Sequence, residues 1–183
     1  DFAMDQSWAP TDGNISGHAK IDGRSVFVSA DDFTVLGGSI GGVGWAKFTR
    51  AQDYAYTMGV PLVQLVDTGG GRPQEQHANY GYANLSHFVR HTRHSGAIPQ
   101  IALVMGPAVA GIAYGPALMD FIFMVKKTSY MFIAGPPVVK SLISEEVSQE
   151  DLGGSRIHTQ VSGLSDLACE NDQDCIQRCK ELL

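Results

Sequence analysis

Nineteen consecutive residues without a formal charge, Ile101–Met119, constrain the fold of this chain more than any other feature. A run of this length is close to what a membrane-spanning helix needs. However, Pro107 and Pro116 interrupt it, each directly after a glycine, and its first half is strand-like. These breaks argue against a continuous spanning helix. We therefore predict a buried strand, a turn and a short helix here, and no membrane segment.

Strand and helix patterns alternate along the rest of the chain, after an irregular lead-in over residues 1–13. Asp22-Gly23 is a two-residue hairpin signal between apolar runs. The alternation that follows predicts a single α/β domain over residues 1–183 with a parallel sheet. The expected strands are Ile15–Ile21, Ser25–Ala30, Pro61–Asp67, Ile98–Met105, Phe121–Val125 and Tyr130–Ile133. The expected helices are Gly44–Met58 (ended by Gly59), Asn79–His94 and Gly111–Leu118, followed by helices over Pro137–Leu183 joined at Gly153-Gly154 and Gly163.

Composition excludes some classes of function. The formal net charge is −6, which argues against a nucleic-acid binder because such a protein needs a basic face. The three cysteines, all within the last fifteen residues, match no common zinc spacing. We expect reduced, incidental thiols, no metal site and an intracellular protein.

The first candidate site is the cluster Gly69-Gly70-Gly71-Arg72, which follows a predicted strand. Three glycines allow the backbone to form a concave nest of N–H groups that suits an anion or a polarised carbonyl. Arg72 adds a positive charge able to take a phosphate or a carboxylate. The alternative is a plain tight turn in which Arg72 pairs with Asp67 or Glu75, and composition alone favours neither.

The second candidate is the segment Met105–Ala113, which we expect to turn at Gly106-Pro107 and enter a helix near Ala110-Gly111. Free N–H groups at a helix start stabilise negative charge, and small side chains let a ligand touch the backbone. These are the requirements of an oxyanion hole. Close packing of a helix on a sheet also favours small residues, so the pattern alone leaves both interpretations open.

Side-chain catalysts of the common kinds are missing from the sequence. It contains no G-x-S-x-G, no H-E-x-x-H and no Walker loop. His87, His91 and His94 form an i, i+4, i+7 stripe that we interpret as a polar helix face in preference to a metal site. Tyr54 and Tyr114 are expected in the core. Any chemistry would therefore rest on backbone electrostatics.

Five blocks carry a family resemblance, and they arrive in the family's order. The chain resembles the β, or carboxyltransferase, subunits of biotin-dependent acyl-CoA carboxylases, among them those of propionyl-CoA carboxylase type. The blocks are FTVLGGSIGG (33–42), DTGGGRPQE (67–75), IPQIALVMGPAVAGIAYGPALMDF (98–121), TSYMFIAGPPVVK (128–140) and EEVSQEDLGGSRIHTQVSG (145–163).

The resemblance implies a fold, a reaction and a set of site residues. The fold is a crotonase (ClpP-like) spiral of ββα units, the first of two related halves, with the C-terminal half absent. The reaction passes a carboxylate between biotin and the α-carbon of an acyl-CoA, with biotin itself taking the α-proton. The amides of Ala110 and Gly111 would hold the enolate oxygen. The CoA pocket would be lined by Gly69, Gly70, Gly71 and Arg72, with Gly37 and Gly38 nearby and Lys47 and Arg50 as weaker candidates for the phosphates.

The resemblance also implies partners and a location. Coenzyme A enters as part of the substrate, and biotin is carried by a biotin carboxyl carrier protein or domain that works with a biotin carboxylase component. A homo-oligomer, at least a dimer, is implied. The location is the cytoplasm, or the mitochondrial matrix in a eukaryote.

The chain departs from the family pattern at the candidate sites. Family members usually carry Cys-Ala-Gly-Gly where this chain has Ala108-Val109-Ala110-Gly111, so Ala110 adds a methyl group. Pro73 removes a backbone donor beside Arg72. Gly42 and Gly44 replace residues that are commonly polar or charged. These changes bear on acyl specificity.

Three alternatives remain beside carboxyl transfer. A decarboxylase of malonyl- or methylmalonyl-CoA would use the same enolate hole. A hydratase or isomerase of the crotonase type needs a glutamate near the second turn, and residues 106–120 contain none. A non-catalytic assembly subunit would keep the fold without the chemistry.

Overall fold

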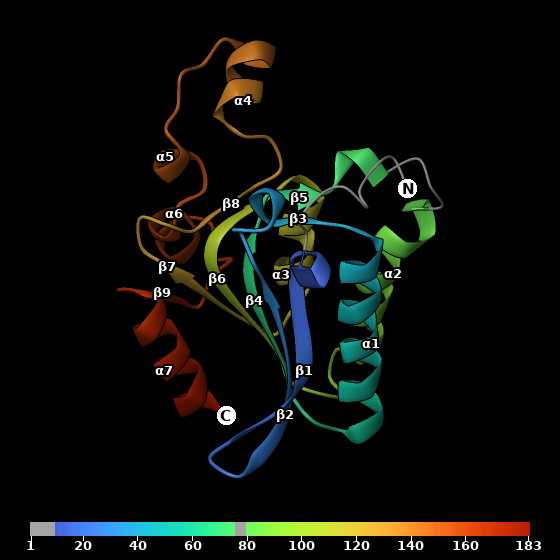
Figure 1. The fold of residues 1–183 in the computed structure, drawn as a ribbon. Helices are drawn as coiled ribbons and strands as arrows, with labels where there is room; N and C mark the ends of the chain where they lie inside the picture. The colour runs from blue at the N-terminus through green and yellow to red at the C-terminus, as the bar shows by residue number, and fades with distance from the viewer. Residues whose placement is uncertain (1–9, 76–79) are drawn as a thin grey trace.

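A computed structural model describes residues 10–75 and 80–183, and its central feature is a seven-stranded sheet (Figure 1). The order across the sheet is β1-β2-β4-β6-β7-β9, with β8 also pairing with β6. Only β1 and β2 pair antiparallel, and the other pairs are parallel. The strands are β1 (Asn14–Ile21), β2 (Arg24–Asp31), β4 (Leu62–Thr68), β6 (Gln100–Val109), β7 (Phe121–Val125), β8 (Tyr130–Phe132) and β9 (Leu167–Cys169).

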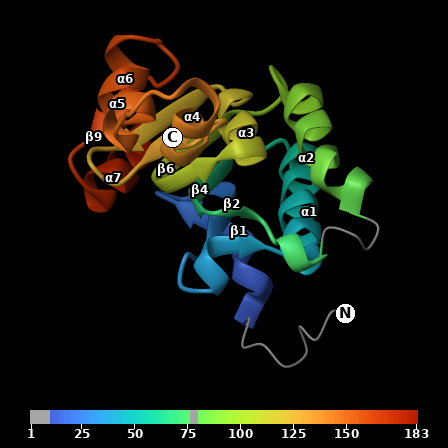
Figure 2. The ribbon, with the colours of Figure 1, turned by 90° about the horizontal axis from the view of Figure 1, so that it is seen from above.

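Helices cover both faces of this sheet. Helices α1 (Gly42–Met58) and α2 (Tyr80–His94) lie side by side on one face, and α7 (Asp172–Leu182) packs on the other (Figures 1 and 2). One core, which includes Trp45 and Phe48 of α1, fills the first interface. A second core, which includes Cys175 and Cys179 of α7, fills the other. The remaining helices are α3 (Tyr114–Ala117), α4 (Pro136–Ile143), α5 (Gln149–Gly153) and α6 (Ser155–Gln160).

Short elements connect these layers at the carboxyl ends of the parallel strands. A two-stranded parallel sheet, β3 (Ser39–Ile40) and β5 (Gly70–Gly71), lies beside the end of β4. The 3-10 turns are η2 (Pro10–Gly13), η3 (Leu36–Gly38), η4 (Pro73–Glu75) and η5 (Ala110–Ala113). Ligands bind at this end of parallel sheets because the connecting loops open there.

The sequence-based predictions of secondary structure hold for the hairpin and for most of the alternation. Asp22 and Gly23 both have positive φ, 49° and 85°, as a two-residue hairpin turn of type I′ requires. Gly59 ends α1 in the left-handed region at φ 64°. The predicted start of the second helix, Asn79, lies outside the described residues.

Two predictions about strands are wrong. The strand predicted as Ile98–Met105, β6, continues through Gly106 and Pro107 to Val109, because Pro107–Val109 pair with β8. The turn therefore begins at Ala110 and not at Gly106-Pro107. The segment after Pro137 also contains a strand, β9, which pairs with β7, so it is not purely helical.

Two predictions about side-chain burial are wrong. Tyr54 and Tyr114 are not in the core as expected, since they are 52% and 46% exposed. The histidine stripe of α2 is not a polar surface, because His87, His91 and His94 are all buried where α2 packs on α1 and α3. The three cysteines are free thiols buried between the sheet and α7.

Two expected absences concern metal and membrane. Over residues 10–75 and 80–183, the histidine, cysteine and carboxylate side chains form no group of three suited to a metal ion. In the same ranges, none of the helices combines the length and the apolar character that crossing a bilayer demands.

Candidate functional site

A cavity of about 300 Å³ brings the two glycine-marked strand ends together. One side is backbone from Gly69–Gly71, after β4, and from Val109–Ile112, after β6. The other side is formed by ring side chains of α1 and α2. The residues lining it are Trp45, Gly69, Gly70, Gly71, His87, Phe88, Val109, Ala110, Gly111 and Ile112. Two segments that the sequence marks separately thus share one site.

The turn after β6 presents its backbone to this cavity. Ala110 and Gly111 are exposed and begin η5, and the first N–H groups of a helix have no partner within it. A Cβ placed on Gly111 would meet no heavy atom within 4 Å. Ala110 adopts φ 57°, in the left-handed region that glycine occupies more cheaply. A glycine at this position, as in the resembled family, would relax the backbone, so the methyl group of Ala110 adds strain to the turn.

The strand end after β4 is braced by neighbouring backbone. The amide of Gly69 donates to the carbonyl of Gly37 at 3.2 Å, and the Thr68 hydroxyl donates to the carbonyl of Gly38. A Cβ on Gly69 would come within 2.8 Å of the Gly37 carbonyl oxygen, and one on Gly38 within 2.7 Å of the Asp67 oxygen. Gly37 and Gly38 therefore lie outside the cavity and set the position of the Gly69–Gly71 segment.

Arg72 does not line the cavity, and it is 3% exposed. Its guanidinium donates to the carboxylates of Asp12 and Glu75, and to the backbone oxygen of Ser39 at 2.7 Å. The predicted pairing with Glu75 is present. The predicted alternative, Asp67, instead contacts Gly106, where an added Cβ would come within 1.8 Å of an Asp67 carboxylate oxygen. The structure thus places Arg72 in a buried ion-pair cluster.

The same cluster organises the start of α1. Gly41, the N-cap, makes no side-chain cap, but the amide of Gly42 donates to Glu75 at 3.1 Å and that of Gly44 to Asp12 at 2.8 Å. Negative charge at a helix start also interacts favourably with the helix dipole and so stabilises the helix. A Cβ on Gly44 would lie 2.8 Å from the Asp12 carbonyl oxygen and from Ile40. The unusual Gly44 is therefore explained by this close approach.

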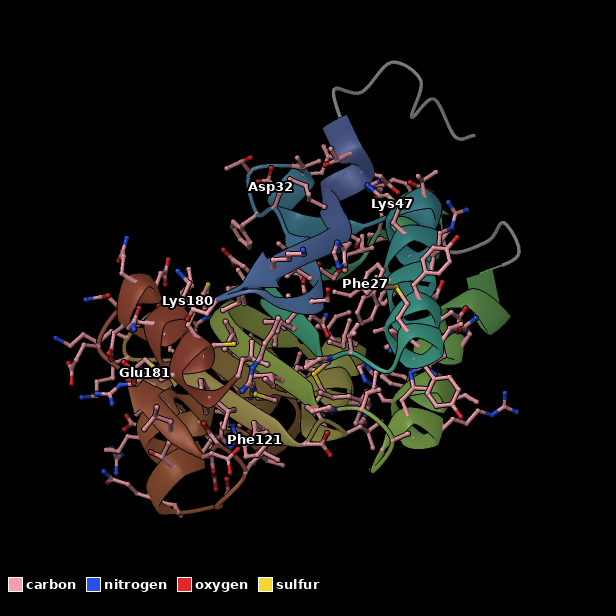
Figure 3. The ribbon with its side chains drawn as sticks, turned by 90° about the horizontal axis from the view of Figure 1, so that it is seen from below. Phe27, Asp32, Lys47, Phe121, Lys180 and Glu181 are labelled. Carbon is pink, nitrogen blue, oxygen red and sulfur yellow. The ribbon has the colours of Figure 1, made fainter. Side chains whose placement is uncertain are left out.

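Lys47 and Arg50 lie on a different face of α1 from Trp45 and line a second cavity, of about 310 Å³, with Phe27 and Tyr54. Figure 3 shows Lys47 on α1. Residues two apart on a helix project about 200° apart, so Lys47 and Trp45 point in nearly opposite directions. The Lys47 ammonium donates to the carbonyls of Thr11 and Asn14. Burial lowers the pKa of Lys47, and the nearby Asp12 carboxylate opposes that change. The structure does not bring these two cations to the cavity beside Gly111.

Sequence reasoning missed the ring-bearing wall of the cavity. The indole of Trp45 stacks on the His87 imidazole, with ring centroids 4.6 Å apart and an interplanar angle of 25°. Phe88 meets Tyr114 edge to face at 5.9 Å. The histidine stripe is a sequence signal for this wall, but its pattern alone is also typical of an exposed helix face.

Comparisons with known proteins agree with this geometry. The model of the family described as "Carboxyl transferase domain" matches residues 1–183, and the chain belongs to that family. It is 48% identical to methylmalonyl-CoA decarboxylase subunit alpha of Veillonella parvula, over 100% of this chain and 36% of the relative. It is 47% identical to the mitochondrial propionyl-CoA carboxylase beta chain of Sus scrofa, over 99% of this chain and 34% of that protein. The chain thus spans about a third of the length of these relatives.

Solved structures show the same fold. The transcarboxylase 12S crystal structure with methylmalonyl-coenzyme A and methylmalonic acid bound has a TM-score of 0.95 at 38% identity, over 100% of this chain and 35% of that one. The beta subunit of geranyl-CoA carboxylase from P. aeruginosa has a TM-score of 0.85 at 34% identity, over 93% and 32%. The crotonase-like fold inferred from the resemblance is confirmed.

Proposed function

We propose that this chain forms the acyl-CoA side of a carboxyltransferase, which moves a carboxylate between carboxybiotin and the α-carbon of a short-chain acyl-CoA such as acetyl- or propionyl-CoA. The observation that carries the proposal is the shared cavity of the Gly69–Gly71 segment and the Ala110–Gly111 turn. Two relatives named for acyl-CoA substrates, each close to half identical in sequence, support the same chemistry.

In this proposal the amides of Ala110 and Gly111 donate to the thioester oxygen. That oxygen becomes more negative when the α-carbon loses a proton or a carboxylate, so donors fixed beforehand stabilise the enolate more than the ground state. Gly69–Gly71 lines the same backbone wall, and its lack of side chains leaves room for the thioester. Gly37 and Gly38 hold this segment through the bonds at Gly69 and Thr68.

The remaining predicted residues receive narrower roles. Arg72 is a positioning residue, because its guanidinium forms ion pairs with Asp12 and Glu75. Arg50 is exposed and keeps a weaker candidacy for the CoA phosphates, whereas the ammonium of Lys47 is occupied by two carbonyls. Biotin supplies the carboxylate when bound. The residues of this cavity fit the thioester, whereas the resemblance assigns the oxyanion hole for biotin to the second half of the family's fold.

Partners and location are proposed from the family as well. The chain would work with a biotin carboxyl carrier and a biotin carboxylase component, as part of a homo-oligomer, and inside the cell. One solved relative is described as a hexamer assembly and a multienzyme core.

A matched pair of variants at Gly111 tests the oxyanion role in the full-length enzyme. Gly111→Pro removes the amide donor, whereas Gly111→Ala keeps it at a position with open space for a methyl group. We expect Gly111→Pro to lower kcat by about 100-fold or more, and Gly111→Ala to change it little. Thermal unfolding of both variants checks that they fold. Equal turnover in the folded Pro variant and the wild type would refute the role.

Decarboxylation of methylmalonyl-CoA is the second candidate, favoured by the relative from Veillonella parvula. The same enolate hole serves both directions of the reaction. Product analysis of the full-length protein distinguishes them, with propionyl-CoA plus carboxybiotin in one assay and methylmalonyl-CoA plus biotin in the other.

A further inference from the structure

The two walls of the cavity beside Ala110 and Gly111 differ in chemistry. The backbone wall offers N–H groups, whereas the ring wall consists of Trp45, His87 and Phe88. Among the described lining residues, none carries a permanent formal charge. A thioester oxygen belongs at the backbone wall, so the acyl tail faces the rings.

The ring wall is held in place at its centre by His87, which is 3% exposed. Its imidazole stacks on Trp45 at 4.6 Å and meets the Phe48 ring at 6.0 Å. Its backbone oxygen accepts a hydrogen bond from the fully buried Gln52 at 3.2 Å. The backbone and the ring of His87 are therefore both fixed.

Helix α3 and His91 lie next to the His87 ring. A Cβ on Gly115 of α3 would make ordinary van der Waals contact with both rings, at 4.0 Å from His87 Cδ2 and 3.9 Å from His91 Nε2. His91 is itself fixed, because its Nδ1 lies 2.7 Å from Gln100 Oε1 and its carbonyl accepts from Gln100 Nε2 at 3.0 Å. Close-packed interiors resist displacement, so the depth of the cavity on this side is set by the His87 ring.

From this packing we infer that His87 is a specificity-determining residue, whose ring limits the length of the acyl tail that the cavity accepts. The inference rests on the proposed function and narrows its substrate class to acyl-CoA thioesters with short, uncharged tails. The volume, about 300 Å³, is at the lower end of the range for ligand pockets, in agreement with a short tail.

The experiment compares propionyl-CoA with hexanoyl-CoA in the full-length enzyme. His87→Ala opens the end of the cavity, whereas His87→Phe keeps a ring there. His94→Ala is the matched control, because His94 lies on the same helix but stacks on Tyr56, outside this cavity. Both kcat/KM and equilibrium binding are measured for each thioester.

We expect His87→Ala to raise the hexanoyl-to-propionyl ratio of kcat/KM at least tenfold, because each methylene accommodated in an apolar pocket is worth about 10-fold or more. His87→Phe and His94→Ala should keep the wild-type ratio. An equal rise in His94→Ala would assign the effect to loosened packing of α2 and overturn the inference. An unchanged ratio in folded His87→Ala would also overturn it.

Failure of the proposed function gives a different result, since the wild-type protein would then bind neither thioester. If His87→Ala does not fold, Trp45→Phe opens the same wall from the other side of the stack. In folded Trp45→Phe the hexanoyl-to-propionyl ratio of kcat/KM should rise severalfold. An unchanged ratio in that variant overturns the inference.

Discussion

The two glycine-marked strand ends differ in what holds them. The segment after β4 is braced by Gly37, Gly38 and Thr68, and its arginine is enclosed by carboxylates. In the turn after β6, Ala110 and Gly111 are exposed residues, and there is open space at Gly111. Both segments follow a core strand and both are rich in small residues. The same sequence signature therefore serves as a brace at one strand end and as a ligand-facing backbone at the other.

This difference changes how a charged residue beside glycines is interpreted. Arg72 looks like a ligand-binding cation in the sequence, but its charge stabilises the frame around the cavity. In the proposed function the thioester oxygen is bound by backbone amides. The sequence marks such groups only by small residues and glycines.

Removing the charge at the braced strand end should have the largest effect on stability. Arg72→Ala leaves Asp12 and Glu75 partly buried without their cation, and breaking such a pair costs about 3–5 kcal/mol. Urea unfolding measures the loss. Arg178→Ala, which breaks an exposed pair with Asp174, should cost far less, because solvent screens that pair. Equal costs for the two variants would contradict the buried role of Arg72.

Alanine at the two glycine positions compares the strand ends directly. At Gly69 the new Cβ would lie 2.8 Å from the Gly37 carbonyl oxygen, so we expect a loss of about 1–3 kcal/mol in the free energy of unfolding. At Gly111 the new Cβ meets nothing, so the change should stay within about 0.5 kcal/mol. Denaturant unfolding of the two variants tests the difference, and a larger cost at Gly111 would reverse the comparison.

Two buried groups outside the cavity should make stability depend on pH with opposite signs. Burial raises the pKa of Asp31, next to Asp67, to about 7, so the folded state holds more protons than the unfolded state and stability falls as pH rises from about 4 to 7. Burial lowers the pKa of His91, which bonds Gln100 at the start of β6, to about 4, so stability rises as pH rises from about 4 to 6.5. Each slope is at most about 1.4 kcal/mol per pH unit.

Asp31→Asn separates the two contributions. The variant should become more stable with rising pH between about 4 and 6.5, since only the His91 contribution remains, while the wild type stays nearly flat in that window. Unfolding in urea at pH values of about 4.5, 6 and 7.5 gives the slopes. A flat profile in Asp31→Asn would show that His91 does not titrate as described.

The smallest expected effect is at Ala110. Ala110→Gly relieves the left-handed backbone at φ 57°, which costs an alanine about 1–2 kcal/mol. The glycine also raises the conformational entropy of the unfolded chain, which lowers the free energy of unfolding by about 0.4–1 kcal/mol. The net change should be a gain of about 1 kcal/mol or less, seen as a slightly higher Tm. Ala110→Val should destabilise, because a β-branched residue is poorly tolerated at positive φ. A lower Tm in Ala110→Gly would contradict the strain.

Local features of the fold are predictable from the sequence because their causes are local. The Asp22-Gly23 turn and the Gly59 helix end depend on backbone conformations that particular residues favour. The continuation of β6 through Pro107 depends on β8, a strand more than twenty residues later. No periodicity in the strand itself carries that information.

The candidate site divides in the same way. Its backbone half is marked by glycine, whereas the burial of His87 depends on where α1 and α3 lie. Likewise, Asp12 belongs to a segment that reads as an irregular lead-in, and its role becomes visible only when Arg72, sixty residues later, lies beside it. Sequence reasoning finds residues with unusual backbone freedom, but it does not find the partners that pair with buried charges.

The position of Asp12 has a consequence for the order in which this domain assembles. Its carboxylate links three segments far apart in the chain: the lead-in, the start of α1 and the residue after β5. Contacts of such long sequence separation form slowly, because loop closure must precede them. The hairpin and α1 can therefore form early, and closure around Arg72 is expected among the last folding steps. The frame beside the candidate cavity would gain its final shape only when the segment around Asp12 docks onto Arg72.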